Sequence, residues 1–126
     1  MIFMQTYRQQ IYEYIKETYS ASPEYLWMRY PDYAVFRHTG NQKWFCAVMD
    51  VPRDKLGLTG TKRTDILNVK MHDAVEADYL KQQPGYLRSY HMGGACWVSV
   101  LLDGTVPLPE ICVRIDESFR NTAAKQ

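Results

Sequence analysis

The sequence has no apolar run that approaches the ~18 residues of a membrane span. Residues 1–4 also lack the charged and apolar regions of a signal peptide. Cysteine is scarce: Cys46, Cys96 and Cys112 cannot all be paired, and they lie in apolar strand-like or helix-like patterns. We therefore expect buried thiols in a reducing compartment, and a cytoplasmic protein without membrane contact.

The chain also lacks the residue spacings of metal sites and of common active sites. Its three histidines and three cysteines show no C-x-x-C or H-x-x-x-H pattern. A pair of Cys46 or Cys96 with His91 stays open, because nucleophile and base can be distant in the chain, but a packed thiol is the simpler interpretation. Glu13 and Glu17 alone do not form the cluster of oxygens that a hard cation needs. We expect no catalytic residues, no metal and no cofactor.

A strong charge of one sign is absent as well. The formal net charge is +1, far from that of a dedicated nucleic-acid coat protein. The 126 residues, 46% of them hydrophobic, are enough for one core, so we predict a single domain over 1–126. Within it, residues 29–70 carry eight Lys and Arg against four Asp, a surplus of +4, while both flanks are mildly acidic. Any basic surface is therefore local.

Apolar periodicity predicts three helices. Residues recur at steps of three and four along the first of them: Met4, Tyr7, Ile11, Tyr14 and Ile15. Asp73 followed by Glu76 resembles a capping box that opens a short helix ended by Pro84. Pro109 suits the first position of a final helix whose apolar face includes Ile111 and Ile115.

Extended segments are predicted at about 34–39, 43–51, 65–70, 87–90 and 96–102, with a short one near 24–27. The link 40–42 is short enough for a hairpin, and 53–63 reads as a mobile loop. Segment 43–51 is apolar on both faces, which is typical of a central strand. Short links between strands favour an antiparallel sheet, and the element order favours an α+β fold with the helices mainly on one side.

Several motifs together resemble those of the MmcQ/YjbR family of small bacterial proteins. They run in order and at matching spacing from about Pro23 to the C-terminus: Val35-Phe36-Arg37-His38, Lys43-Trp44-Phe45, Met49-Asp50-Val51-Pro52-Arg53 with Lys55-Leu56-Gly57-Leu58, Leu67-Asn68-Val69-Lys70, Pro84-Gly85, Tyr90-His91-Met92, Trp97 and Leu102-Asp103-Gly104. The resemblance implies a curved antiparallel sheet backed by helices, similar to the CyaY-like (frataxin-like) fold. It also implies binding of double-stranded DNA by a double-wing mode, in which β-hairpins act as wings.

A wing needs cations for phosphates and a few planar or amide groups for bases and sugars. The predicted DNA contacts are Arg37, His38, Asn41, Lys43, Lys62, Arg63, Asn68, Lys70, Arg88, Tyr90 and His91. One contact of the family pattern is missing, because Gly93-Gly94-Ala95 follows Tyr-His-Met where Asn and a basic residue are usual.

Each of these residues also has a structural interpretation. Exposed cations are usually solvated, Trp44 and Trp97 are more often core anchors than stacking platforms, and His38 or Asn68 can simply satisfy backbone groups. The alternative function is a small-molecule- or protein-binding module that uses an aromatic open face of the sheet, which ten tyrosines make plausible. Salt dependence separates the two, because phosphate binding weakens steeply with salt. In either case we expect a monomer.

Overall fold

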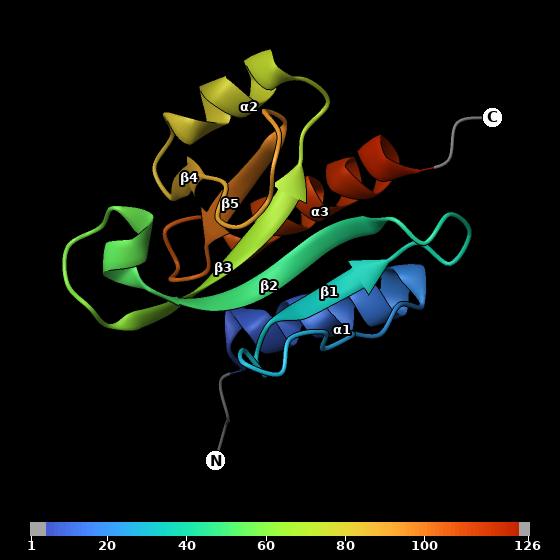
Figure 1. Cartoon of the computed structure of the whole chain (residues 1–126). Coiled ribbons are helices and arrows are strands. Elements are labelled where there is room, and N and C mark those ends of the chain that lie inside the picture. Colours follow the sequence, from blue (N-terminus) through green and yellow to red (C-terminus); the bar gives the residue numbers. More distant parts are fainter. Residues whose placement is uncertain (1–4, 124–126) are drawn as a thin grey trace.

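The computed structural model describes residues 5–123. They form one five-stranded antiparallel sheet and three α-helices, the predicted α+β fold (Figure 1). The strands are β1 (Ala34–Arg37), β2 (Trp44–Pro52), β3 (Arg63–Lys70), β4 (Tyr86–Arg88) and β5 (Trp97–Leu101), in the order β1-β2-β3-β5-β4. The segment near 24–27 contributes a single bridge, Glu24 to Val35. The predicted central strand, β2, is paired on both sides, although β3 is the middle strand.

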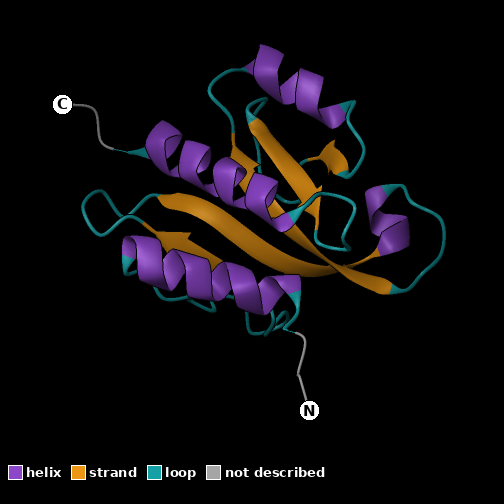
Figure 2. Ribbon diagram, turned by 180° about the vertical axis from the view of Figure 1, so that it is seen from behind, coloured by secondary structure: helices purple, strands orange, loops and turns teal. Residues whose placement is uncertain are grey.

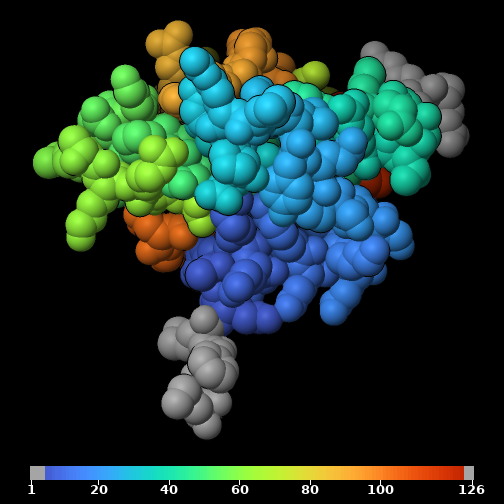
Figure 3. Space-filling view, turned by 60° about the horizontal axis from the view of Figure 1, so that its bottom comes forward, coloured from blue at the N-terminus to red at the C-terminus, as the bar shows by residue number. Residues whose placement is uncertain are grey.

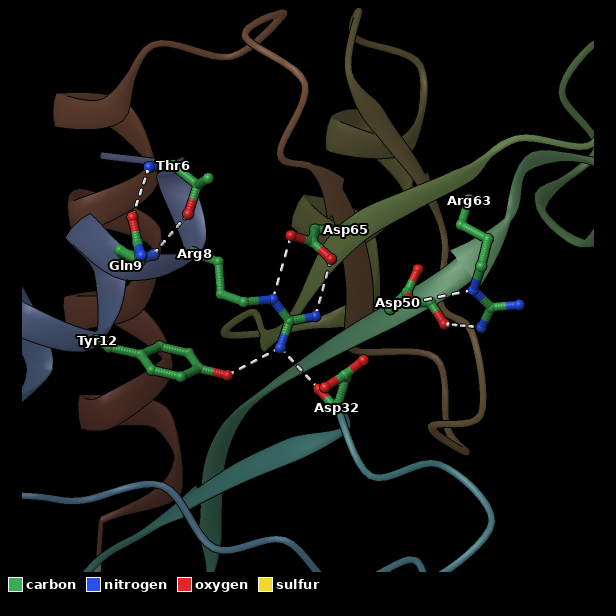
Figure 4. A network of polar contacts seen from close by, with 8 residues as sticks. All are labelled: Thr6, Arg8, Gln9, Tyr12, Asp32, Asp50, Arg63 and Asp65. Carbon is green, nitrogen blue, oxygen red and sulfur yellow. Dashed lines mark hydrogen bonds and ion pairs between the residues drawn. The ribbon is translucent and has the colours of Figure 1, made fainter. Parts of the chain in front are cut away.

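Helix α1 (Tyr7–Tyr19) forms because its apolar residues share one face and its first turn is capped. Ile11 and Ile15, four residues apart, are both fully buried. Thr6 and Gln9 make a complete capping box, which satisfies two backbone N–H groups that the helix leaves free (Figure 4). Met4, predicted as part of this helix, lies outside the described residues.

Helices α2 (Ala74–Lys81) and α3 (Leu108–Thr122) follow the predicted signals. The Asp73 carboxylate accepts a hydrogen bond from the Glu76 backbone N–H, which caps α2. Pro109 lies in the first turn of α3, where a missing N–H costs no hydrogen bond. α1 and α3 lie side by side across the same face of the sheet (Figure 2), and Asp116 of α3 accepts hydrogen bonds from Tyr14 and Tyr19 of α1.

The sheet separates two apolar clusters. The larger lies under the helices, where Phe36, Phe45 and Leu67 pack against Ile11 and Ile115. The smaller lies on the helix-free face around residues such as Val35, Met49 and Ile66. Partly buried side chains pack against this second cluster, among them Trp27, Leu56, Leu58, Leu87 and Tyr90. The aromatic face that the sequence suggested as an open receiving surface is therefore largely a second core.

One polar network fixes α1 to the sheet. The Arg8 guanidinium donates to both carboxylate oxygens of Asp65, at 2.8 and 3.1 Å, to the Asp32 carbonyl and to the Tyr12 hydroxyl (Figure 4). Burial acts to lower the pKa of Arg8, but its contacts with Asp65 and Tyr12 raise it overall, so the side chain stays charged. Such bidentate pairs are strong and orienting, and this one sets the angle between helix and strand.

The thiols differ from the expectation of three buried cysteines. Cys46 in β2 is fully buried, whereas Cys96 and Cys112 are half-buried, and all three are free. The sequence pattern misled because Cys96 lies just before β5, on a loop, and Cys112 lies beside the apolar face of α3 rather than on it.

The connections gather at two ends of the sheet. One end, here called the hairpin end, carries the β1–β2 turn (residues 38–43), the end of β3, the start of β5 and the last turn of α3 (Figure 1). The opposite end, here called the loop end, carries residues 53–62, which begin with the short 3-10 helix η1 (Arg53–Leu56).

Candidate nucleic-acid interface

A basic hollow lies at the hairpin end. Its volume is about 790 Å³, and Lys43, Lys70, His72 and Arg120 lie along its wall with Cys96 and Asn121. No Asp or Glu contributes to this wall within residues 5–123. Across the same described residues, no carboxylate lies within ion-pair distance of Lys43, Lys70 or Arg120. The hollow therefore concentrates positive charge, which suits an anionic group.

Ser118 explains why the hollow exists. The pairing of β2 with β3 ends at Cys46 and Val69, so Phe45 and Lys70 are not paired. The buried Ser118 hydroxyl takes that place: it accepts from the Lys70 backbone N–H at 2.7 Å and donates to the Phe45 carbonyl at 2.5 Å. Ser118 of α3 thus bridges β2 and β3 where their pairing ends, and Asn121 donates to the Lys70 carbonyl at 2.9 Å. This docking brings Arg120 beside Lys70.

The β1–β2 turn forms the rim of the hollow. Asn41 holds it from both sides, because its side-chain oxygen accepts from the Lys43 backbone N–H and its amide donates to the Thr122 carbonyl. The second bond satisfies a carbonyl at the end of α3 that has no partner within the helix. Asn41 is therefore a structural residue of the turn, whereas the Lys43 side chain is exposed to solvent.

His38 does not reach solvent, contrary to its predicted DNA contact. Its ring is buried against Phe45 and Phe119, and its Nε2 lies 2.8 Å from the Thr122 hydroxyl. Burial lowers the pKa of His38, against an opposing hydrogen bond to the Phe119 backbone. The sequence could not show this, because Phe119 and Thr122 are some eighty residues away in the chain.

Asn68 is also buried, so the structure removes it from the predicted contacts. Its side-chain oxygen accepts from the Ser99 hydroxyl and its amide donates to the Tyr90 carbonyl, at 2.5 and 3.1 Å. Ser99 in turn accepts from the Tyr90 backbone N–H at 3.0 Å. The two side chains thus bind both backbone groups of Tyr90 and hold residues 89–91 on the sheet. Asn68 therefore has the structural role, satisfying backbone groups, that was the alternative to DNA contact.

The two predicted arginines near the turns are already engaged. Arg37 pairs with Glu24 at 2.9 Å and lies 5.9 Å from the Trp44 ring. Arg63 pairs with Asp50 at 3.0 Å and also donates to the Asp50 carbonyl (Figure 4). Both remain partly exposed, but each carries its charge next to a carboxylate. Their attraction for a phosphate is correspondingly weaker than that of Lys43 or Lys70.

The remaining predicted contacts are spread over the molecule. Lys62 is exposed at the loop end, opposite the hairpin end, and Figure 3 shows the two regions at opposite sides of the surface. Arg88 and His91 are exposed, and the Tyr90 ring is half-buried beside the second core. Of the predicted set, the structure brings only Lys43 and Lys70 to the wall of the basic hollow. Sequence reasoning missed His72, Arg120 and Asn121, since nothing local indicates that α3 ends beside β3.

Comparison with known proteins agrees with this architecture. A sequence model of the YjbR family matches residues 16–121. The chain belongs to the YjbR family. It is 42% identical to the uncharacterized protein YyaQ of Bacillus subtilis (strain 168) over 115 residues, which are 91% of this chain and 97% of that protein.

Solved structures show the same fold. A crystal structure of a Pseudomonas syringae protein has 38% identity and a TM-score of 0.89, covering 95% of this chain and all of the other. A Deinococcus radiodurans protein of 19% identity superimposes with a TM-score of 0.66, over 92% of this chain and 77% of that one. The second likeness concerns the fold alone. The YjbR assignment made from the motifs is confirmed, and these relatives carry no stated activity.

Two features of the described part of the chain bear on function. No helix within residues 5–123 has the length and apolar character to cross a membrane. Nor do those residues bring three His, Cys, Asp or Glu side chains together as a metal site would require.

Proposed function

We propose that this YjbR-family chain binds double-stranded DNA, as a non-enzymatic protein that uses the loops at the two ends of its sheet as wings. One observation carries the proposal: the basic hollow unites Lys43, Lys70 and Arg120 without a carboxylate among the described residues of its wall. Cations without nearby acids retain their full attraction for phosphate, and release of counterions then drives binding.

The spacing of the two wings supports a duplex. β2 joins the turn 38–43 to the loop 53–62 and has nine residues, so the wings are separated by roughly 30 Å. One turn of B-DNA rises about 34–36 Å, so two wings at this distance meet the backbone about one turn apart. Lys55 and Lys62 are exposed on the second wing and supply cations there.

We propose binding rather than catalysis, and the burial of Cys46 and His38, two of the groups that could act as nucleophile or base, supports this choice. Burial raises the pKa of the Cys46 thiol and lowers that of His38. Neither faces the basic hollow, and His38 already has a partner in Thr122. The three free cysteines are consistent with action in the reducing cytoplasm.

The test is fluorescence anisotropy of a labelled duplex at low and near-physiological salt. Affinity should fall with salt, with a log–log slope near −0.9 for each phosphate neutralised. Lys43→Glu should weaken binding and reduce the slope by about one. Lys16→Glu is the matched control, because Lys16 is an exposed lysine on α1 next to Glu13 and Glu17 and undergoes the same change of charge. Absence of binding at low salt, or equal effects of the two variants, would reject the proposal.

The second candidate function is binding of a small molecule or peptide. A hollow of about 340 Å³ at the loop end is lined by Arg29, Tyr30, Tyr33 and the Asp50–Arg63 pair. The rings of Tyr30 and Tyr33 are stacked at 4.6 Å. Its wall carries Asp32 and Asp50 against Arg29 and Arg63, so such a site would take a planar ligand without a strong charge, and its affinity would change little with salt. If the duplex fails to bind, this hollow is the first surface to screen.

A further inference from the structure

A second hollow at the hairpin end surrounds Trp97. It has a volume of about 620 Å³ and is lined by Trp97, Arg88, Lys81 and Ser89, together with Gly93 and Gly94. This volume lies within the usual range of small-molecule sites, about 300–1,000 Å³. The hollow adjoins the basic hollow, since Cys96 lines one and Trp97 the other.

Trp97 differs from the other two tryptophans. Trp27 and Trp44 pack edge to face at 5.6 Å within the second core. Trp97 is half-buried, belongs to neither apolar cluster, and has no aromatic partner or indole hydrogen bond among the described residues. The sequence favoured a core role for Trp97, and the structure instead leaves its indole lining a hollow. An aromatic side chain of this kind is what a stacking platform requires.

Polar groups line the same hollow as this indole. Arg88 is exposed and has no carboxylate within ion-pair distance in the part of the chain that the structure describes, while Lys81 has only a 3.7 Å contact with Asp78. The Ser89 hydroxyl is buried and has no hydrogen-bond partner among residues 5–123. A buried hydroxyl without a partner costs free energy, which a ligand that bonds to it would recover.

We propose that this hollow binds a nucleotide, with the base stacked on Trp97 and the phosphate held by Arg88 and Lys81. Lys70 and Trp97 are opposite each other in the β3–β5 pair, so a strand whose phosphate lies on Lys70 has its next nucleotide within reach of the indole. Asp78 and Ser89 supply an acceptor and a hydroxyl for the edge of the base. The nucleotide comes either from an unpaired position in bound DNA or from free nucleotide.

The inference deepens the proposed DNA binding and rests on it for the first of these two sources. Direct evidence would come from the three indole N–H signals in a two-dimensional NMR spectrum, assigned with Trp97→Phe and Trp44→Phe. Deoxythymidine monophosphate should move the Trp97 signal and leave those of Trp27 and Trp44 in place. Arg88→Glu should abolish the shift, whereas Arg29→Glu, the same charge change at an exposed arginine in the loop-end hollow, should not.

The source of the nucleotide is decided by comparing a fully paired duplex with the same duplex carrying one bulged thymidine. Stacking on an aromatic residue is worth about 1–3 kcal/mol per base, so the bulged duplex should bind at least about fivefold more tightly, and Trp97→Leu should remove the difference. A Trp97 shift without this preference assigns the hollow to free nucleotide. If neither the monophosphate nor the bulged duplex moves the Trp97 signal, the inference is wrong. This holds even if paired duplex binds and the binding depends on Lys43, in which case only the proposed DNA binding is supported. A Trp97 shift without binding of paired duplex would instead reject the duplex proposal alone.

Discussion

Ser118→Ala tests how the hairpin end is built. The substitution removes one hydroxyl that accepts from the Lys70 N–H and donates to the Phe45 carbonyl. Ser118 is fully buried, and Phe45 is buried on the same side. Each buried backbone group left without a partner costs about 1–3 kcal/mol. Because Lys70 borders the basic hollow, water can partly replace its lost bond, so we expect a total of about 2–4 kcal/mol.

Urea unfolding followed by circular dichroism measures this difference, since a single domain of this size is expected to unfold in one step. Ser89→Ala is the matched control: it removes a buried serine hydroxyl that has no hydrogen-bond partner, so it should cost little or even stabilise. If Ser118→Ala costs no more than Ser89→Ala, the strands can close without Ser118. The hollow would then not depend on the docking of α3.

Three further predictions concern the buried groups. Burial lowers the pKa of His38, so protonation near the ordinary value of about 6.5 favours the unfolded chain, and the free energy of unfolding should fall between pH 7.5 and 5.5. Urea unfolding at the two pH values should show a smaller fall in His38→Gln. His72→Gln, a change at an exposed position, should behave as the native protein. Asn68→Leu removes the acceptor of the Ser99 O–H and the donor to the Tyr90 carbonyl, and should lower the free energy of unfolding by about 2–4 kcal/mol. A change under about 0.5 kcal/mol would show that Asn68 does not hold Tyr90. Cys96 and Cys112 should react with a thiol reagent in the native protein, whereas Cys46 should react only on unfolding, because burial excludes the reagent and raises the pKa of this thiol. Peptide mapping by mass spectrometry measures the labelling of each cysteine. Early labelling of Cys46 would contradict its burial.

The elements of the fold were predictable because they depend on local pattern. The steps of three and four in α1, the Asp73 cap and the Pro109 position each mark a helix. The same holds for the 40–42 turn, because a short link between two apolar segments leaves few arrangements other than a hairpin. The motifs then indicated the family, which the comparisons confirm.

The site was less predictable, because it depends on contacts between distant segments. Whether His38 faces solvent is decided by Phe119 and Thr122, and whether Asn68 is free is decided by Ser99 and Tyr90. The proximity of Arg120 to Lys70 arises from the docking of α3 through Ser118 and Asn121. None of these pairings has a signature in the spacing of residues. Charge counting found an excess over 29–70 but could not show that its members divide between the two ends of the sheet.

That division changes how DNA binding should be tested. The sequence alone suggests charge reversal at Lys62 and Arg63, but Arg63 is paired with Asp50, so Arg63→Glu would both remove a cation and place two carboxylates together. A loss of affinity in that variant could therefore come from a disturbed β2–β3 pair rather than from a lost phosphate contact, because Asp50 lies on β2 and Arg63 begins β3. Lys43 has no such partner in the described chain, so its reversal changes the surface charge of the basic hollow alone. Lys43, rather than Arg63, is the residue at which a change in affinity reports on phosphate binding.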